Sequence, residues 1–228
     1  MKKAADELNR EVLMPPLIKV AVIDDEPLMR RALARLMKSA SIEPAIFSSA
    51  HDFLSDPIHQ RVDCVVTDMR MPGVDGLKLQ EELCKTLPHL SLVFITGHGN
   101  VPSSVKAMKG GAVDFLEKPV DGEALLAAVR RAAERSRALK ASRDELTAFK
   151  LRYEELTARE RQVFLLITAG LLNKQAAADL GLAEKTVKVH RARVMEKMGA
   201  DSLAELVRMA ERLGVGKPDS PSASPSSR

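Results

Sequence analysis

The 228-residue chain has few aromatic residues and few cysteines. It contains no tryptophan, one tyrosine and six phenylalanines, too few for a stacking platform of the kind that binds single-stranded nucleic acids. Two cysteines, Cys64 and Cys84, do not make a disulfide scaffold. We expect both to be reduced, partly buried thiols. Any nucleic-acid binding by this chain is therefore expected to depend on a helix.

Long hydrophobic runs are absent as well. The longest apolar stretches, such as 90–96 and 163–167, fall far short of the roughly 18 residues that a membrane span needs. Residues 1–10 are polar and mixed in charge, without the apolar segment of a secretory signal. The composition, 45% hydrophobic and 29% charged, is typical of a folded globular protein. We expect a cytoplasmic protein with no membrane partner.

Charge and composition divide the chain into segments. Residues 17–120 carry 12 basic and 13 acidic side chains, whereas residues 157–213 carry 10 and 7. Between them, 122–156 is rich in Ala, Leu, Arg and Glu, which predicts one long helix or a helix with a frayed linker. The end of the chain is poor in apolar residues and rich in Ser and Pro. We predict a first domain at 17–135, a helical linker at 136–153, a second domain at 154–213 and a disordered tail at 214–228.

The first domain alternates between short apolar runs and amphipathic segments. The expected strands are 17–23, 45–47, 64–67, 92–95 and 113–116, and the helices that follow them are 27–40, 50–54, 77–83, 101–108 and 124–129. Strands that alternate with helices require right-handed crossovers, so the predicted fold is α/β, a five-stranded parallel doubly wound sheet. In such a sheet the functional site lies at the carboxyl ends of the strands.

Polar side chains follow four of the five expected strands. They are Asp24, Asp25 and Glu26 after the first, Asp68 after the third, Thr96 after the fourth and Lys118 after the fifth. Clustered carboxylates repel one another unless a cation compensates, and oxygen ligands without Cys or His suit Mg²⁺. A lysine and a hydroxyl opposite them could hydrogen-bond a phosphoryl group. These residues predict a phosphoryl-transfer site with an aspartate as nucleophile.

Two other phosphate chemistries fit these residues less well. A flavodoxin-like nucleotide binder would place a Gly-, Ser- or Thr-rich loop after the first strand, where this chain has three acids that would repel phosphate. A phosphatase of the haloacid dehalogenase type has a second Asp two residues after its nucleophile as acid and base. Arg70 occupies that position, so fast turnover of foreign phosphate esters is not expected.

Four motifs in order resemble the receiver domain of bacterial two-component response regulators. They are Asp24-Asp25, the segment 66–76 (VTDMRMPGVDG), Thr96-Gly97 and the segment 114–119 (DFLEKP). The resemblance covers about residues 17–135. It implies that Asp68 accepts a phosphoryl group from a phosphohistidine on a sensor histidine kinase.

The same resemblance implies roles for the neighbouring residues. Asp25 and Asp68 would bind Mg²⁺ together with the backbone carbonyl of Arg70, while Asp24 would act through water. Thr96 and Lys118 would contact the phosphoryl oxygens. Phe115 would rotate inward as Thr96 moves toward the phosphate, although an aromatic residue in a short strand is also an ordinary core residue.

The C-terminal part carries the pattern of a helix-turn-helix. Thr157 and Glu160 have the spacing of a capping box, and Gly170 is expected to close the helix that follows. A short helix at 173–180 then meets Gly181, and a third helix runs from about Glu184 to Met198. Residues 184–197 include five basic and two acidic side chains. Val187, Val194 and Met198 recur at helical spacing and are expected to face inward.

Residues 154–213 resemble the four-helix DNA-binding domain of the LuxR, NarL and FixJ regulators. The segments 156–160 (LTARE), 173–174 (NK) and 185–191 (KTVKVHR) carry the resemblance. It implies that Lys185, Thr186, Lys188 and Val189 face DNA, together with Ala192 and Arg193 on the outer face, and that the last helix, 202–213, mediates dimerisation. Ala176 departs from the family, which more often has Ile there.

Both halves together resemble a response regulator of the FixJ subgroup. This implies a transcription factor that is phosphorylated on Asp68, dimerises and binds double-stranded promoter DNA, with RNA polymerase as a further partner. It is not an enzyme, apart from assisting its own phosphorylation and hydrolysis. The competing interpretation is a constitutive DNA-binding protein whose receiver is a phosphorylation-independent protein-interaction module.

Overall fold

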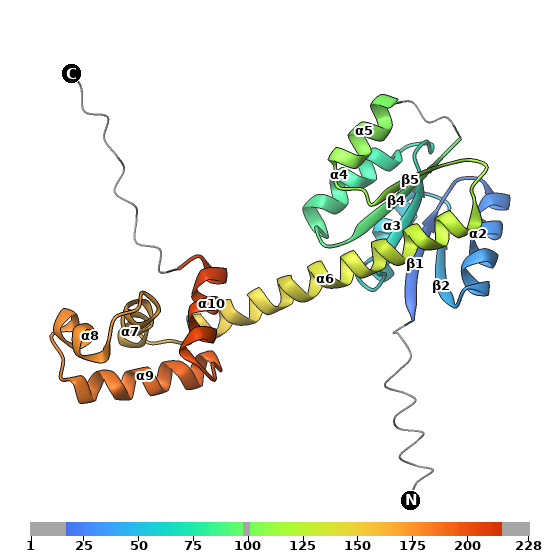
Figure 1. Cartoon of the computed structure of the whole chain (residues 1–228). Helices are drawn as coiled ribbons and strands as arrows, with labels where there is room; N and C mark the ends of the chain where they lie inside the picture. Colours follow the sequence, from blue (N-terminus) through green and yellow to red (C-terminus); the bar gives the residue numbers. More distant parts are fainter. Residues whose placement is uncertain (1–16, 98–100, 216–228) are drawn as a thin grey trace, which may run out of the picture. The chain divides into compact units, whose positions relative to one another are not determined.

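The fold is given by a computed structural model, which describes residues 17–97 and 101–215. The first sixteen residues and most of the expected tail, from residue 216 on, lie outside the described residues. The chain divides into two compact units on either side of the Ala141–Ser142 peptide bond. Figure 1 shows an α/β unit and a helical unit, as the sequence predicts.

Within the described residues, the first unit is built on one sheet of five parallel strands. Its strands are β1 (Ile18–Ile23), β2 (Ile42–Phe47), β3 (Cys64–Asp68), β4 (Ser91–Thr96) and β5 (Asp114–Glu117), in the order β2-β1-β3-β4-β5. Every residue of β3 and β4 is buried, because a parallel sheet is covered on both faces. The predicted doubly wound fold is therefore confirmed.

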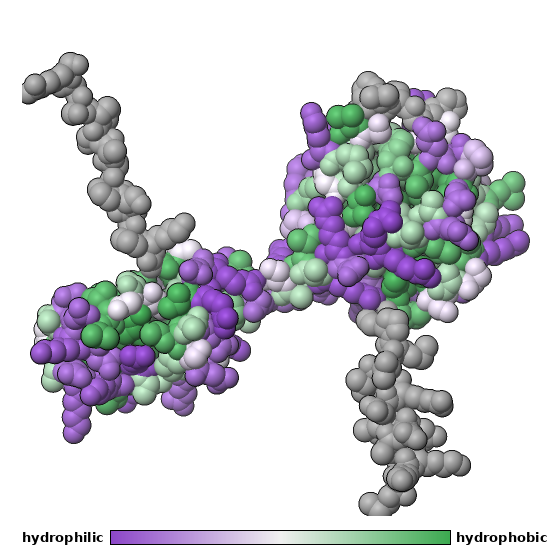
Figure 2. All heavy atoms as spheres, viewed as in Figure 1, coloured by the Kyte–Doolittle hydropathy of each residue, from purple (hydrophilic) through white to green (hydrophobic). Residues whose placement is uncertain are grey.

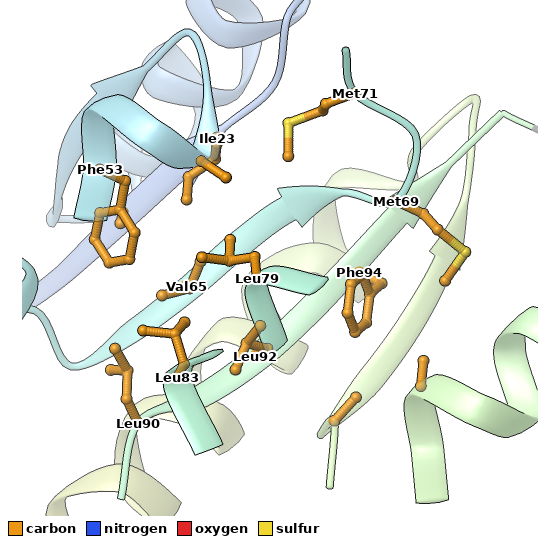
Figure 3. Packing of buried hydrophobic residues seen from close by; sticks show 14 of the residues in the cluster. Ile23, Phe53, Val65, Met69, Met71, Leu79, Leu83, Leu90, Leu92 and Phe94 are labelled. Carbon is orange, nitrogen blue, oxygen red and sulfur yellow. The ribbon is translucent and has the colours of Figure 1, made fainter. Parts of the chain in front are cut away.

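Helices cover both faces of this sheet (Figure 1). They are α2 (Pro27–Ser39), α3 (Ala50–Ser55), the 3₁₀ helix η1 (Pro57–Gln60), α4 (Gly76–Thr86), α5 (Val101–Lys109) and α6 (Gly122–Glu154). One core cluster joins the sheet to α3, α4 and α5, and includes Phe53, Leu79 and Phe94. Figure 3 shows these side chains gathered against the strands. A second cluster joins the other face to α2 and α6.

The sequence misplaced some element boundaries. Strand β2 begins at Ile42, three residues before the predicted start, because Glu43 and Pro44 interrupt the apolar pattern although the backbone pairs with β1. The short helix η1 was not predicted; Pro57 begins it and the Asp56 side chain caps it. Cys64 is buried as expected, but Cys84 is exposed; it lies on the side of α4 that approaches the end of α5, where its thiol donates to the Gly110 carbonyl at 3.6 Å.

The register of the strands brings their carboxyl ends to one edge. Ile23 pairs with Thr67 and Thr96 pairs with Glu117. The residues that follow β1, β3 and β5 therefore emerge together, beside the end of β4. This edge is where the polar residues singled out in the sequence are found.

The second unit packs the end of α6 with four further helices. They are α7 (Ala158–Thr168), α8 (Asn173–Leu180), α9 (Glu184–Met198) and α10 (Leu203–Leu213). The capping box is confirmed, since Glu160 N–H donates to Thr157 Oγ1 at 3.3 Å and Thr157 N–H donates to Glu160 Oε2 at 2.9 Å. Gly181 ends α8 with φ of +64°, a conformation that glycine adopts without strain.

The surfaces of both units are largely polar. In Figure 2 hydrophilic side chains cover much of the visible face of each unit, with smaller hydrophobic areas between them. None of the helices in the described part of the chain has the length and apolar character needed to cross a membrane.

Candidate functional site

Three carboxylates meet at the carboxyl edge of the sheet. Asp24 and Asp25 follow β1 and Asp68 ends β3, and one oxygen from each lies within 4.8 Å of the others. Asp24 and Asp68 are buried, whereas Asp25 is exposed. Backbone N–H groups orient the two buried carboxylates: Glu26 N–H donates to Asp24 Oδ1 at 2.8 Å and Arg70 N–H donates to Asp68 Oδ1 at 2.9 Å. The predicted acidic cluster is thus formed.

The ammonium group of Lys118 lies among the acidic side chains. Its Nζ donates to Oδ2 of Asp68 at 2.6 Å, to Oδ2 of Asp24 at 3.0 Å and to Oε1 of Glu26 at 3.2 Å. The backbone N–H of Lys118 donates to the carbonyl of Thr96 at 2.8 Å, which fixes the residue beside the end of β4. The lysine therefore compensates part of the negative charge that the strand ends bring together.

Burial and pairing shift the ionisation of this group of side chains. Burial raises the pKa of the Asp24 carboxyl, and hydrogen bonds from the Glu26 N–H and from Lys118 only partly oppose the shift. Burial by itself would lower the pKa of the Lys118 ammonium, but its hydrogen bonds to Asp68 and Asp24 outweigh that effect and raise the pKa above its usual value. Lys118 is therefore a permanent cation at the site.

Asp25, Asp68 and Lys118 line a cavity of about 270 Å³. Its lining residues are Asp25, Glu26, Asp68, Arg70, Thr96, Gly97 and Lys118. Thr96 is fully buried at the end of β4. Phe115 is half-buried and packs against the core cluster on the side of α3, α4 and α5. The structure thus brings together the residues predicted from the strand ends, with Phe115 in the adjacent core.

The donor set of this cavity fits a hard divalent cation. Asp24, Asp25 and Asp68 offer only carboxylate oxygens, within 4.8 Å of one another, and Mg²⁺ prefers such ligands together with water. Asp25 is exposed and lines the cavity, so a cation could keep several water ligands. Asp24 and Asp68 are already paired with Lys118, so a bound cation would share these carboxylates with the lysine.

Some residues that position the site were not predicted. Arg30 Nη1 donates to the carbonyl oxygen of Asp24 at 2.5 Å. A Cβ atom at Gly76 would lie 2.6 Å from the carbonyl oxygen of Asp68 and 2.9 Å from the Phe94 ring, so only glycine lets α4 begin there. No sequence motif marks Arg30 as part of the site. Gly76 could have been found, because it belongs to the 66–76 motif that contains Asp68.

Helix α9 of the second unit has two distinct faces. Val187, Val194 and Met198 are fully buried, which confirms the predicted inward face. The outer face is exposed at Lys185, Thr186, Lys188, Val189, Ala192 and Arg193. The outer face therefore presents basic, small and apolar side chains together, as a helix that reads a DNA groove does.

Two polar contacts hold α9 against its neighbours. Arg191 Nη1 donates to Oδ1 of Asn173, the first residue of α8, at 3.1 Å. Near the other end, Lys197 Nζ lies 2.7 Å from Oε2 of Glu160 in α7. Glu160 is buried, and the hydrogen bond from Lys197 lowers the pKa of its carboxyl to about 2. These contacts fix the orientation of α9 within the helical unit.

Comparison with known families matches both units. Residues 20–130 match the model of the response regulator receiver domain. Residues 154–210 match the model of the LuxR family of bacterial regulatory proteins. The two matches agree with the two resemblances that the sequence motifs carry.

Characterised relatives extend the match over most of the chain. Nodulation protein W of Bradyrhizobium diazoefficiens is 46% identical over 196 residues, which is 86% of each chain. Transcriptional regulatory protein FixJ of Azorhizobium caulinodans is 45% identical over 206 residues, 90% of this chain and 98% of FixJ. The low-resolution structure of response regulator StyR is 40% identical with a TM-score of 0.75, over 86% of this chain and 99% of StyR.

Proposed function

Because this chain belongs to the two-component response regulators with a LuxR-type DNA-binding domain and is a transcriptional regulator of that kind, we propose that Asp68 is its phosphoacceptor. The observation that carries this proposal is the contact between Lys118 Nζ and Asp68 Oδ2, 2.6 Å long, beside Asp24 and Asp25. The phosphoryl donor is a phosphohistidine of a sensor kinase.

The reaction is a transfer of one phosphoryl group. A carboxylate oxygen of Asp68 attacks phosphorus, the P–N bond to the kinase histidine breaks and a P–O bond forms, so the histidine nitrogen leaves with the electron pair. The charged ammonium group of Lys118 contacts the phosphoryl oxygens, and the Thr96 hydroxyl donates a hydrogen bond to one of them. Mg²⁺ held by Asp24, Asp25, Asp68 and the carbonyl of Arg70 would supply positive charge against the remaining oxygens. The receiver thereby assists its own phosphorylation and later hydrolysis.

Phosphorylation then gates the assembly of the regulator. Charge added at Asp68 draws Thr96 and Phe115 inward and favours a homodimer. A dimer places two α9 helices on half-sites about one DNA turn apart, so that two linked weak contacts with promoter DNA become a strong one. In this scheme α10 contributes to dimerisation, and RNA polymerase is a partner of the dimer bound to the promoter. We also propose the domain boundaries that the sequence predicts: a receiver at 17–135, a linker at 136–153 and a DNA-binding domain at 154–213.

Sedimentation velocity tests the gating. Wild-type protein in Mg²⁺ is expected to change from monomer to dimer on treatment with acetyl phosphate, and Asp68→Asn to stay monomeric. A variant that still dimerises on treatment would contradict the assignment of Asp68. If neither protein responds, the receiver is instead a phosphorylation-independent interaction module and DNA binding is constitutive.

Salt titration tests the DNA-binding face. Fluorescence anisotropy with a mixed-sequence duplex of about three helical turns measures affinity against salt concentration. Lys185→Ala and Arg193→Ala are each expected to reduce the slope of log affinity against log salt by about 1. Arg159→Ala, an exposed basic residue at the start of α7, is the control and should leave the slope unchanged. An equal reduction of the slope in all three variants would contradict the assignment of this face of α9 to DNA binding.

A further inference from the structure

A groove between α4 and α5 lies on one face of the receiver sheet, where Figure 1 shows the two helices side by side. The end of α5 approaches α4 closely: a Cβ atom at Gly110 would lie 2.7 Å from the Gln80 carboxamide, and the Cys84 thiol donates to the Gly110 carbonyl at 3.6 Å. Next to this contact the two helices line an open groove of about 570 Å³, a volume within the range of small-molecule sites.

The groove is distinct from the acidic cavity. The two share none of their lining residues. Leu77 and the Cys84 thiol contribute an apolar surface from α4, and the aliphatic stems of Lys106 and Lys109 face them from α5. Gln80 is buried in the groove wall, where its Nε2 donates to the carbonyl of Ala107 at 2.9 Å. This hydrogen bond joins α4 to α5 in the wall of the groove.

The charge around the groove is positive. Its lining contains Lys85, Lys106 and Lys109 against the single carboxylate of Glu81. Lys106 is paired with Glu81 at 3.2 Å and Lys85 with Glu82 at 3.9 Å. Lys109 has no carboxylate within ion-pair distance among the described residues, so it supplies the uncompensated positive charge. An occupant with an apolar body and one negative charge would match both the interior and the rim, whereas a cation or a neutral polar molecule would match neither.

We propose that this groove binds a small amphiphilic anion, with its apolar body against Leu77 and Cys84 and its anionic group at Lys109. The site is independent of phosphoryl transfer, because Asp68 and Lys118 take no part in it. It couples the ligand to the position of α5, since α4 and α5 form opposite walls.

The chain contains its own reporter for this site. Of its two cysteines, Cys84 is exposed in the groove, whereas Cys64 is fully buried and burial raises the pKa of its thiol. A disulfide reagent such as 5,5′-dithiobis(2-nitrobenzoate) therefore modifies Cys84 first in the native protein. A ligand in the groove covers this thiol and slows the reaction.

Octanoate is the probe, and octanol is its neutral counterpart. On the full chain, millimolar octanoate is expected to slow the modification of Cys84 at least fivefold, and octanol at the same concentration to slow it much less. Lys109→Glu should abolish the protection and Lys109→Arg should keep it. Lys78→Glu makes the same charge change at an exposed position of α4 outside the groove and should leave protection intact.

Three outcomes would overturn the proposal. They are absence of protection by octanoate, equal protection by octanol, and protection that survives Lys109→Glu. Asp68→Asn provides a separate control, because it should bind octanoate as the wild type does. A failure of phosphorylation therefore leaves this test unaffected, and a failure of octanoate binding leaves the assignment of Asp68 unaffected.

Discussion

Two hydrogen bonds join Arg137 of α6 to Asp63, the residue before β3: Nε donates to Oδ1 and Nη2 donates to Oδ2, each at 2.8 Å. The same carboxylate accepts the backbone N–H of Lys19 at 2.8 Å. One residue earlier in α6, the hydroxyl oxygen of Ser136 accepts the buried N–H of Ser91 at 2.8 Å. Helix α6 is thus fastened to the amino ends of β1, β3 and β4, opposite the acidic cavity.

We expect Arg137 and Asp63 to be energetically coupled. A double-mutant cycle with Arg137→Met and Asp63→Asn should give a coupling energy of about 1 kcal/mol, because the bidentate pair is only partly exposed. Urea unfolding of the receiver measures it. Arg130→Met, an exposed position on the same helix, should be additive with Asp63→Asn. Additivity of the Arg137 and Asp63 changes would show that the contact does not contribute to stability.

Gly76→Ala is expected to disturb the phosphoacceptor. The added methyl group would meet the Asp68 carbonyl at 2.6 Å and the Phe94 ring at 2.9 Å, so the start of α4 must shift, at a cost of about 1 to 3 kcal/mol. Because this shift moves the backbone next to Asp68, the rate of phosphorylation by acetyl phosphate should also fall.

Gly122→Ala is the matched control for that substitution. Its methyl group would meet only the end of the Leu36 side chain, at 3.3 Å, and a leucine methyl can move aside. Calorimetry should show a receiver transition close to that of the wild type. Equal losses of stability in the two variants would show that the close approach at Asp68 is not the cause.

Asp24→Asn should stabilise the protein in the absence of Mg²⁺. Because burial raises the pKa of Asp24, ionisation of this group costs folding free energy as pH rises from its unfolded pKa to its folded pKa. At pH 7 the amide avoids that cost, and the receiver of the variant should melt at a higher temperature than that of the wild type. We expect Mg²⁺ to raise the melting temperature of the wild type, and we expect this rise to be smaller in the variant. Calorimetry suits both measurements, since the chain has no tryptophan.

Glu160→Gln should weaken the helical unit by about 1 to 2 kcal/mol at pH 7, because the hydrogen bond from Lys197 loses its charged acceptor. The pKa of Glu160 is about 2 in the folded protein. The contribution is therefore complete above the ordinary glutamate pKa and is lost as pH falls from there toward 2. The stability difference between wild type and variant should shrink over that range. A difference independent of pH would mean that the substitution acts through packing.

The sequence by itself determined the class of fold and the membership of the site. Periodicity of apolar residues located the strands of the sheet, and parallel strands end at one edge, so Asp24, Asp68 and Lys118 could be brought together without coordinates. The bounds of α8 and α9 followed from local signals as well. Gly181 ends α8, and the helical spacing of buried apolar residues indicates α9. Each of these inferences needs only neighbours along the chain or one rule of topology.

Only the tertiary structure decided which distant groups touch. Glu26 reaches Lys118 across the cavity, and Gly76 lies against the backbone of Asp68. Lys197 pairs with Glu160 in another helix, and Cys84 is exposed in the groove between α4 and α5. These relationships depend on how helices pack across a sheet or against each other. That packing is set by the sum of many weak contacts between remote residues, which no local pattern records.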